Sequence, residues 1–188
     1  YTSGTVSAGT SVMRFVNAGS VTPGTASYND VQFIGSGNMV VSGTMTINGN
    51  LVIGATTANR TLDTGTLEAY GDVSFTNNGY IGNASLSSKG AASKTLNIAG
   101  TAAVPTGLVT VDKTGGSSLT LTSNASFNST GQSMTVTNGT VDMAGFNLTI
   151  KNTLTLSAGT AVTKGGGTLL VNASSIPSGP YSGGTVNP

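Results

Sequence analysis

Apolar and polar residues alternate along most of the chain, and the alternation stops at a glycine or asparagine after a few positions. A period of two predicts β-strands whose alternate side chains face a common interior, while the longer period of helices is nearly missing. The inward-facing pairs predicted in this way are Val31/Phe33, Met39/Val41, Met45/Ile47, Leu51/Ile53, Leu67/Ala69, Val73/Phe75, Leu96/Ile98, Val109/Val111, Leu119/Leu121, Met134/Val136, Val141/Met143, Leu148/Ile150, Leu154/Leu156 and Leu169/Val171. We therefore expect an all-β fold.

The spacing between these strands decides which all-β architecture to expect. Strands recur in steps of 6 to 8 residues in two distant stretches, at Val31, Met39, Met45 and Leu51, and again at Met134, Val141, Leu148, Leu154, Ala161 and Leu169. Such steps are too short for strands joined by hairpins of ordinary length. Three of them make a repeat of about 20 residues, which is typical of a β-solenoid coil.

The expected fold is a single-stranded parallel β-helix of roughly eight short three-strand coils, each about 22 residues long. In such a fold each coil stacks on the next at about 4.8 Å, and glycine or asparagine turns the chain at the corners. The alternative is a β-sandwich, pilin-like domain. That alternative predicts antiparallel pairing and strands about 8 to 12 residues apart.

The domain organisation follows from where the alternation weakens. We expect residues 1–188 to form one β-solenoid domain, because a chain of this length is short for two ordinary domains. Residues 1–30 alternate weakly and contain Pro23, so they are predicted to be an N-terminal cap or arm. Residues 172–188 carry Pro177, Pro180 and Pro188 and are predicted to be a C-terminal cap or tail.

Two segments resemble the repeats of large secreted surface proteins. The segment YNDVQFIGSGNMVVSGTMTINGNLVI spans residues 28–53, and VTVDKTGGSSLTL, NGTVDMAGFNLTI and NTLTLSAGT lie within residues 108–160. They are similar to autotransporter-associated and filamentous-haemagglutinin-like β-strand repeats. The resemblance covers about half of the chain and implies a parallel β-helix, secretion and an adhesive or scaffold role.

Charge is scarce, and its distribution excludes several classes of partner. Charged residues make up 7% of the chain, far below the roughly 25% of ordinary proteins. The net charge is +1, and the seven Lys and Arg residues are scattered singly. Nucleic acids and anionic membranes therefore have little electrostatic attraction for the chain. No apolar run approaches the roughly 20 residues of a membrane-spanning helix, so no membrane span is expected.

Cysteine and histidine are both missing from the sequence. Disulfide bonds, thiolate or imidazole metal sites and histidine-dependent catalysis are therefore excluded, and no cofactor is expected. The chain begins at Tyr1 rather than Met, as a mature protein without its signal peptide or a fragment would. We expect an extracellular or cell-surface location.

The one acidic cluster in the sequence is Asp63, Glu68 and Asp72, with Arg60 nearby. On a β-helix, carboxylates one coil apart can approach each other and act on polysaccharides, so a polysaccharide-active enzyme is a remote alternative. Oxygen ligands of this kind would also suit calcium, but no loop has calcium-binding spacing. We interpret the three as solvated outward residues, and we do not expect an enzyme.

Two polar patterns remain. Thr-x-Thr pairs begin at residues 44, 120, 135 and 153, and because they recur irregularly we interpret them as outward residues that favour strands. Asn-x-Ser/Thr sequons are candidate glycosylation sites, although we favour their interpretation as corner asparagines. They begin at Asn59, Asn83, Asn124, Asn128, Asn138, Asn147 and Asn172.

The function expected from these observations is structural. We predict a subunit of an extracellular filament or surface layer, whose partners are other copies of itself. The contacts would form through solenoid ends or terminal arms, because end coils expose unpaired strand edges. The predicted assembly arm contains Val6, Val12, Phe15 and Val16. The alternative is an adhesin module that binds surface glycans.

Overall fold

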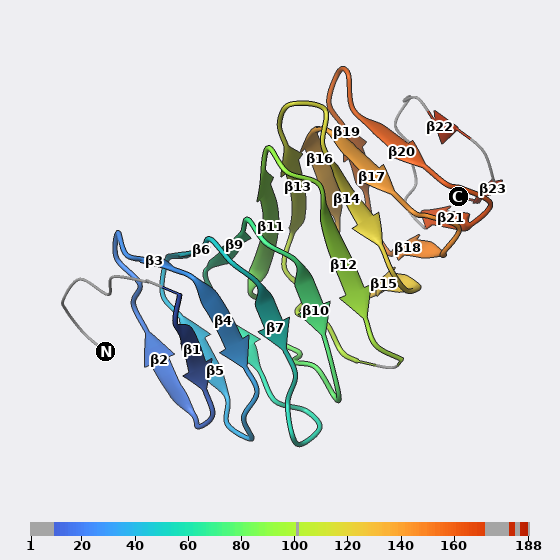
Figure 1. The fold of residues 1–188 in the computed structure, drawn as a ribbon. Coiled ribbons are helices and arrows are strands. Elements are labelled where there is room, and N and C mark those ends of the chain that lie inside the picture. Colours follow the sequence, from blue (N-terminus) through green and yellow to red (C-terminus); the bar gives the residue numbers. More distant parts are fainter. Residues whose placement is uncertain (1–9, 101, 172–180, 183–184, 188) are drawn as a thin grey trace. The chain divides into compact units, whose positions relative to one another are not determined.

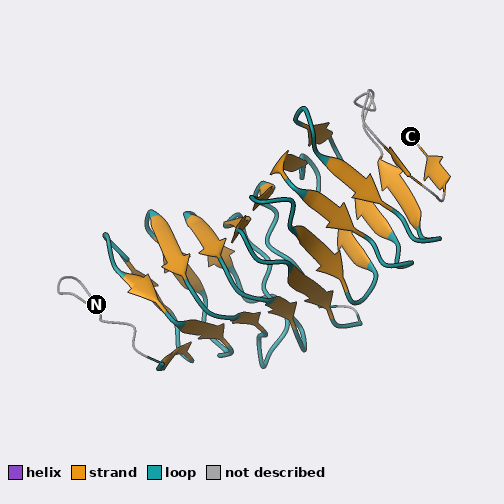
Figure 2. Ribbon diagram, turned by 45° about the horizontal axis from the view of Figure 1, so that its top comes forward, coloured by secondary structure: helices purple, strands orange, loops and turns teal. Residues whose placement is uncertain are grey.

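The structure is a computed structural model that describes residues 10–100, 102–171, 181–182 and 185–187. These residues form strands joined by turns and loops, and none of them lies in a helix, as Figure 2 shows. Short parallel sheets stack as a β-solenoid of about seven turns. The chain divides into two compact units, Tyr1–Ser87 with Ile98–Gly107 and Ser88–Asn97 with Leu108–Pro188, which are described separately below as unit 1 and unit 2.

In unit 1 the chain passes repeatedly over three faces in the same order, which we name A, B and C. Face A consists of β1 (Val12–Phe15), β4 (Asp30–Phe33), β7 (Leu51–Ile53) and β10 (Val73–Phe75), side by side in Figure 1. Face B consists of β2 (Gly19–Val21), β5 (Met39–Val41) and β8 (Leu62–Asp63). Face C consists of β3 (Ser27–Tyr28), β6 (Thr44–Ile47) and β9 (Thr66–Ala69).

Unit 2 repeats the same order of faces. Its face A contains β12 (Lys94–Ile98), β14 (Ser118–Leu121), β17 (Thr140–Asp142), β20 (Ala161–Thr163) and β22 (Tyr181–Ser182). Its face B contains β15 (Ala125–Phe127), β18 (Leu148–Ile150), β21 (Thr168–Val171) and β23 (Thr185–Asn187). Its face C contains β13 (Val109–Lys113), β16 (Met134–Asn138) and β19 (Leu154–Leu156). Strand β11 (Ser85–Gly90) begins in unit 1 and ends in unit 2, and the last residue of β12, Ile98, belongs to unit 1.

All of these strand pairs are parallel, which confirms the solenoid and contradicts the β-sandwich alternative. The number of turns is about seven rather than the expected eight. Coils are of unequal length, because bonded corner residues are 20 positions apart between Asp30 and Asn50 but 25 apart between Ser93 and Ser118. The longer coils use more chain than a uniform repeat of about 22 residues would.

The interior of each unit is filled by the inward residues that the alternation predicts. Every predicted pair is buried except for Leu156, which is half-buried at the end of β19. Further core residues come from short strands and loops, where the alternation is too brief to be read. They include Val21, Leu62, Tyr80, Ala125, Phe127 and Val162.

Glycines stand at the corners for two different reasons. Gly43 has a φ of 101°, a backbone conformation that side chains with a Cβ rarely adopt. Gly37 lacks this conformation, but a Cβ there would collide with the backbone of Ala18 in the preceding coil. At the corners the backbone therefore turns sharply, and the backbones of neighbouring coils lie too close together for a Cβ.

Candidate functional site

The first coil of unit 1 is the candidate assembly site. Strand β1 pairs with β4 on one side, and within the described residues no strand pairs with its other side. Met13 and Phe15 lie opposite Val31 and Phe33, whose side chains are fully buried. Met13 and Phe15 themselves are only half-buried. The apolar column of face A therefore reaches the end of unit 1 without being covered, as far as the structure describes it.

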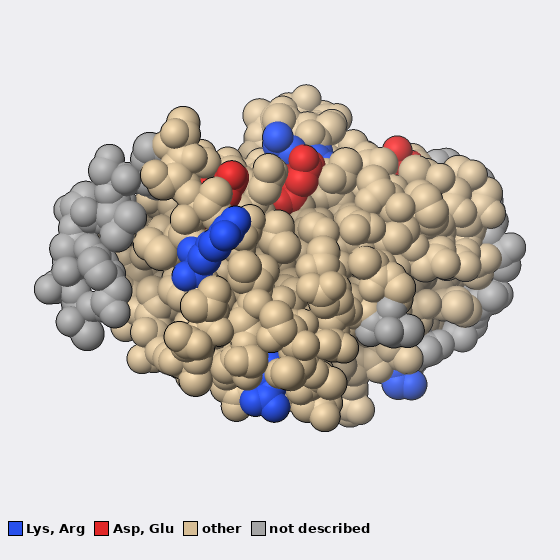
Figure 3. All heavy atoms as spheres, turned by 60° about the horizontal axis from the view of Figure 1, so that its bottom comes forward, with Lys and Arg blue, Asp and Glu red and all other residues tan. Residues whose placement is uncertain are grey.

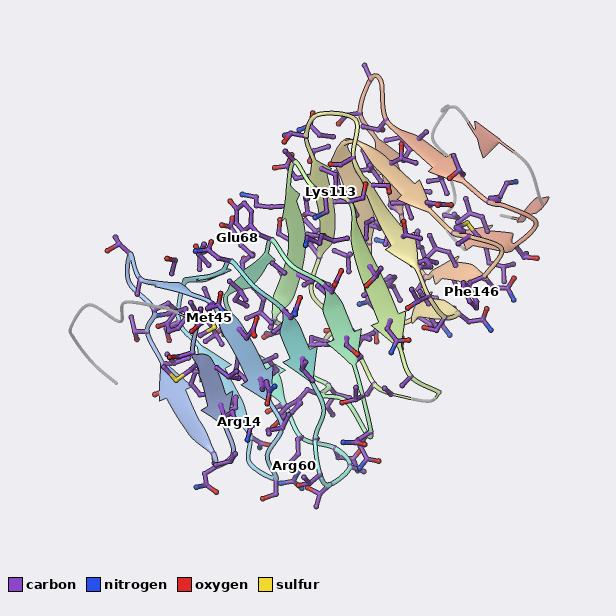
Figure 4. All side chains as sticks on the ribbon, in the orientation of Figure 1. Arg14, Met45, Arg60, Glu68, Lys113 and Phe146 are labelled. Atoms are coloured by element: carbon purple, nitrogen blue, oxygen red, sulfur yellow. The ribbon has the colours of Figure 1, made fainter. Side chains whose placement is uncertain are left out.

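The outer side of β1 is also partly apolar. Val12 and Val16 are 42% and 48% exposed and flank Arg14, which points away from the interior in Figure 4. Three of the four predicted arm residues, Val12, Phe15 and Val16, thus lie in or directly beside the first strand of the solenoid. Val6 lies outside the described residues. We call β1 and β2 together the assembly edge.

Strand β2 presents the second open row of backbone groups. The amide of Gly19 donates a hydrogen bond to the carbonyl oxygen of Asn38 at 3.0 Å, toward β5. Since successive backbone groups of a strand point to opposite sides, the amide of Ser20 faces the open side. No described strand pairs with β2 on that side. The assembly edge can therefore accept a further strand on both faces A and B.

Side-chain amides and carboxylates connect successive coils at the corners. Oδ1 of Asp30 accepts the amide of Asn50 at 2.6 Å, and Oδ1 of Asn50 accepts the amide of Asp72 at 3.0 Å. The same arrangement occurs in unit 2, where Oδ1 of Asn124 accepts the amide of Asn147 and Oδ1 of Asn147 accepts that of Thr168, both at 2.9 Å. These bonds satisfy amides that the strands leave unpaired.

The predicted acidic cluster is not brought together by the fold. Asp63 lies in β8 on face B, Glu68 in β9 on face C, and Asp72 directly before β10 on face A. Nε of Arg60 donates to the carbonyl oxygen of Ala58, and Figure 4 shows Arg60 well apart from Glu68 on unit 1. The part of the chain that the structure describes holds no group of three or more acidic, His or Cys residues able to bind a metal ion.

The sequon asparagines occupy different environments. Asn59 and Asn128 are exposed in loops, and Asn59 has a φ of 59°. Oδ1 of Asn83 accepts the amide of Thr64 at 2.5 Å, and Asn124 and Asn147 belong to the corner bonds above. Asn138 is the one whose Nδ2, the atom that would carry a glycan, donates to Oδ1 of Asp112 at 2.6 Å. Asn172 lies outside the described residues, and glycosylation stays a prediction.

Face C of unit 2 presents a column of threonines. Thr110 on β13 lies opposite Thr135 on β16, which lies opposite Thr155 on β19. Their hydroxyl groups make no hydrogen bond to the described part of the protein. Sequence reasoning missed this column because it considered Thr-x-Thr pairs, whereas Thr110 belongs to no such pair and Thr135 and Thr155 hold different positions in theirs. In unit 1 the arrangement is interrupted, since Thr46 lies opposite Glu68.

Two polar side chains are buried inside the coils. Lys113, labelled in Figure 4, is fully buried at the end of β13, and its Nζ donates to the carbonyl oxygen of Lys89 at 2.6 Å. Tyr80 is 1% exposed in unit 1, and its hydroxyl donates to the carbonyl oxygen of Gly35 at 3.2 Å. Burial raises the pKa of the Tyr80 hydroxyl above its ordinary value of 10.0. Both residues join coils through hydrogen bonds rather than form an accessible site.

The surface is dominated by neutral residues. On the face that Figure 3 shows, Lys and Arg atoms and Asp and Glu atoms form a few small groups that neutral residues separate. A helix long and apolar enough to cross a membrane is not found among the described residues.

Comparison of the chain with family models, curated proteins and solved structures finds no match.

Proposed function

We propose that this chain is a structural subunit of an extracellular filament or surface layer and that it self-associates through the ends of its coils. The observation that carries the proposal is the open apolar column at the assembly edge. Met13 and Phe15 stand in register with the fully buried Val31 and Phe33, yet remain half-buried. A further coil placed on them would continue the core and remove this apolar surface from water.

The strand edges support the same proposal. Open edges of flat strands are sites where another chain adds a strand, and natural proteins usually protect them with charge, proline or a covering segment. Strands β1 and β2 contain no proline, and Arg14 is their one charged residue. A contact between the two different ends of a solenoid is heterologous, and it propagates as a fibre where its rotation does not close a ring.

Composition and sequence resemblance support the extracellular part of the proposal. The surface achieves its polarity with Thr, Ser and Asn rather than with charge, which suits a protein whose outer faces meet other copies of itself. The similarity of residues 28–53 and 108–160 to filamentous-haemagglutinin-like and autotransporter-associated repeats favours a secreted scaffold. The parallel β-solenoid is consistent with such repeats.

The test is the concentration dependence of size. The purified 188-residue chain is followed by light scattering after gel filtration and by negative-stain electron microscopy, and we expect oligomers that lengthen with concentration. Ser20→Pro removes the amide that faces the open side of β2, while Ser20→Ala keeps it. We expect Ser20→Pro to shorten the oligomers and Ser20→Ala to leave them unchanged. Monomers at all concentrations would contradict the proposal.

A second candidate function, glycan binding by an adhesin module, is favoured by the threonine column. Hydroxyl groups of Thr110, Thr135 and Thr155 on consecutive coils are available to bond a sugar chain laid across face C of unit 2. The test is a glycan array probed with the chain and with Thr135→Val, which preserves shape and removes the central hydroxyl. Binding that Thr135→Val abolishes would support this function, and an array without hits would reject it.

A further inference from the structure

Each of the three faces ends, among the described residues, in strands without an outer partner, and faces A and B extend furthest along the chain at both ends. At the N-terminal end the outermost strands are β1 on face A and β2 on face B. At the C-terminal end they are β22 on face A, paired on its inner side with β20, and β23 on face B, paired with β21. Each end therefore offers one strand of face A followed along the chain by one strand of face B.

We infer that copies of this chain stack head to tail, with β22 of one copy adding to β1 of the next and β23 adding to β2. This inference rests on the proposed self-association and names the surfaces that carry it. The strands within each unit are parallel, and head-to-tail stacking continues that parallel pairing and the order of the faces across the junction. Contact between two N-terminal ends would instead bring β1 against a second β1 in the antiparallel direction.

The backbone register of the last strands continues that of the core strands before them. Tyr181 occupies the position opposite Val162, and Val186 occupies the position opposite Leu169; both Val162 and Leu169 are fully buried. On the other side of the junction, Met13 and Phe15 stand at the inward positions of face A, and Val21 at that of face B.

Disulfide trapping tests the junction, because the chain contains no cysteine of its own. Adjacent strands lie about 4.8 Å apart, within the 4.4–6.8 Å range of Cα separations that a disulfide usually spans. Arg14→Cys is combined with Ser182→Cys in one chain, since Arg14 is exposed on β1 and Ser182 lies opposite the outward Thr163. Val12→Cys with Ser182→Cys covers a register displaced by two residues.

With mild oxidation at a concentration where the chain self-associates, we expect one of these two pairs to give a ladder of covalent oligomers extending beyond the dimer. Each single-cysteine variant should give no ladder. The matched control is Gln32→Cys with Ser182→Cys, because Gln32 lies opposite Arg14 one coil further in, about 10 Å from the junction strand and beyond disulfide reach. Circular dichroism checks that every variant keeps the β-sheet spectrum of the parent chain.

The remaining outcomes separate this inference from the proposed function. Oligomers that form without a covalent ladder from either pair would overturn head-to-tail stacking and leave self-association standing. Dimers linked through Arg14→Cys alone would indicate contact between N-terminal ends, and a disulfide within one chain would place its own C-terminal strand on β1; each also overturns the inference. Monomers at all concentrations would overturn both proposals together.

Discussion

The ring of Phe15 stacks on the ring of Phe33 one coil further along, with centroids 4.9 Å apart and planes 13° from parallel. Phe33 is fully buried, whereas Phe15 is half-buried. The pair therefore joins the closed core of unit 1 to its open end.

This difference in burial predicts unequal costs of truncation. Phe33→Ala should lower the free energy of unfolding by about 3–5 kcal/mol, because it leaves a cavity that the stacked coils cannot fill. Phe15→Ala should cost about 1–2 kcal/mol, since less of its surface is buried. It should also weaken self-association, as it removes half of the apolar column at the assembly edge. Urea unfolding and light scattering measure the two effects, and equal costs for both variants would contradict the open end.

The corner bonds of unit 2 lead to a second prediction. Oδ1 of Asn147 accepts the amide of Thr168, and the amide of Asn147 donates to Asn124. Asn147→Ala should cost about 1 kcal/mol, because the Thr168 amide loses its acceptor. Asn147→Asp keeps an acceptor oxygen and should cost less, although both changes remove the sequon. Thermal or urea unfolding compares the variants, and an Asp variant as unstable as the Ala variant would indicate that this bond does not support the corner.

Much of the fold could be predicted from the alternation of apolar and polar residues along the chain. Met134 and Val136 lie in a strand long enough to show the period of two, and both are buried as predicted. Leu62 was missed because β8 has two residues, and Ala125 because a small side chain gives little apolar signal. Between Tyr80 and Thr106 the alternation predicts a single inward pair, Leu96/Ile98, because a longer coil interrupts the regular steps.

The candidate sites were less predictable, since they depend on which residues of different coils become neighbours. Asp63, Glu68 and Asp72 are separated by less than one coil and therefore lie on three different faces. Thr135 and Thr155 became neighbours because their separation equals one coil in that part of the chain. Which residues of neighbouring coils lie opposite each other depends on the number of residues in each coil. The corner loops set that number.

The buried lysine of unit 2 provides a third prediction. Nζ of Lys113 lies inside the coil and donates to the carbonyl oxygen of Lys89. Lys113→Ala removes this bond and leaves a cavity, so it should cost about 3 kcal/mol or more. Lys113→Met keeps most of the volume and should cost about 1–2 kcal/mol, because a buried charge that is replaced by an apolar side chain no longer needs desolvation. Urea unfolding ranks the two, and a Met variant as unstable as the Ala variant would show that the hydrogen bond outweighs packing.

The buried tyrosine of unit 1 yields a prediction about alkaline pH. Because burial raises the pKa of Tyr80 above 10.0, the folded chain holds this proton more tightly than the unfolded chain does. Stability from Tyr80 is therefore fully present below pH 10 and is lost as the pH rises through the folded-state pKa. At neutral pH Tyr80→Phe should cost about 1 kcal/mol, since it loses the bond to Gly35.

The two curves of stability against pH should therefore approach each other as the pH rises above 10, since the Phe variant has no Tyr80 proton to lose. Urea unfolding of both proteins at a series of pH values between 7 and about 11 measures this convergence. Tyr70→Phe is the matched control, because Tyr70 is 37% exposed in the same unit and its removal tests for a general effect of losing a phenol. A constant difference between the parent chain and Tyr80→Phe across the series would contradict the burial of an ionisable hydroxyl at this position.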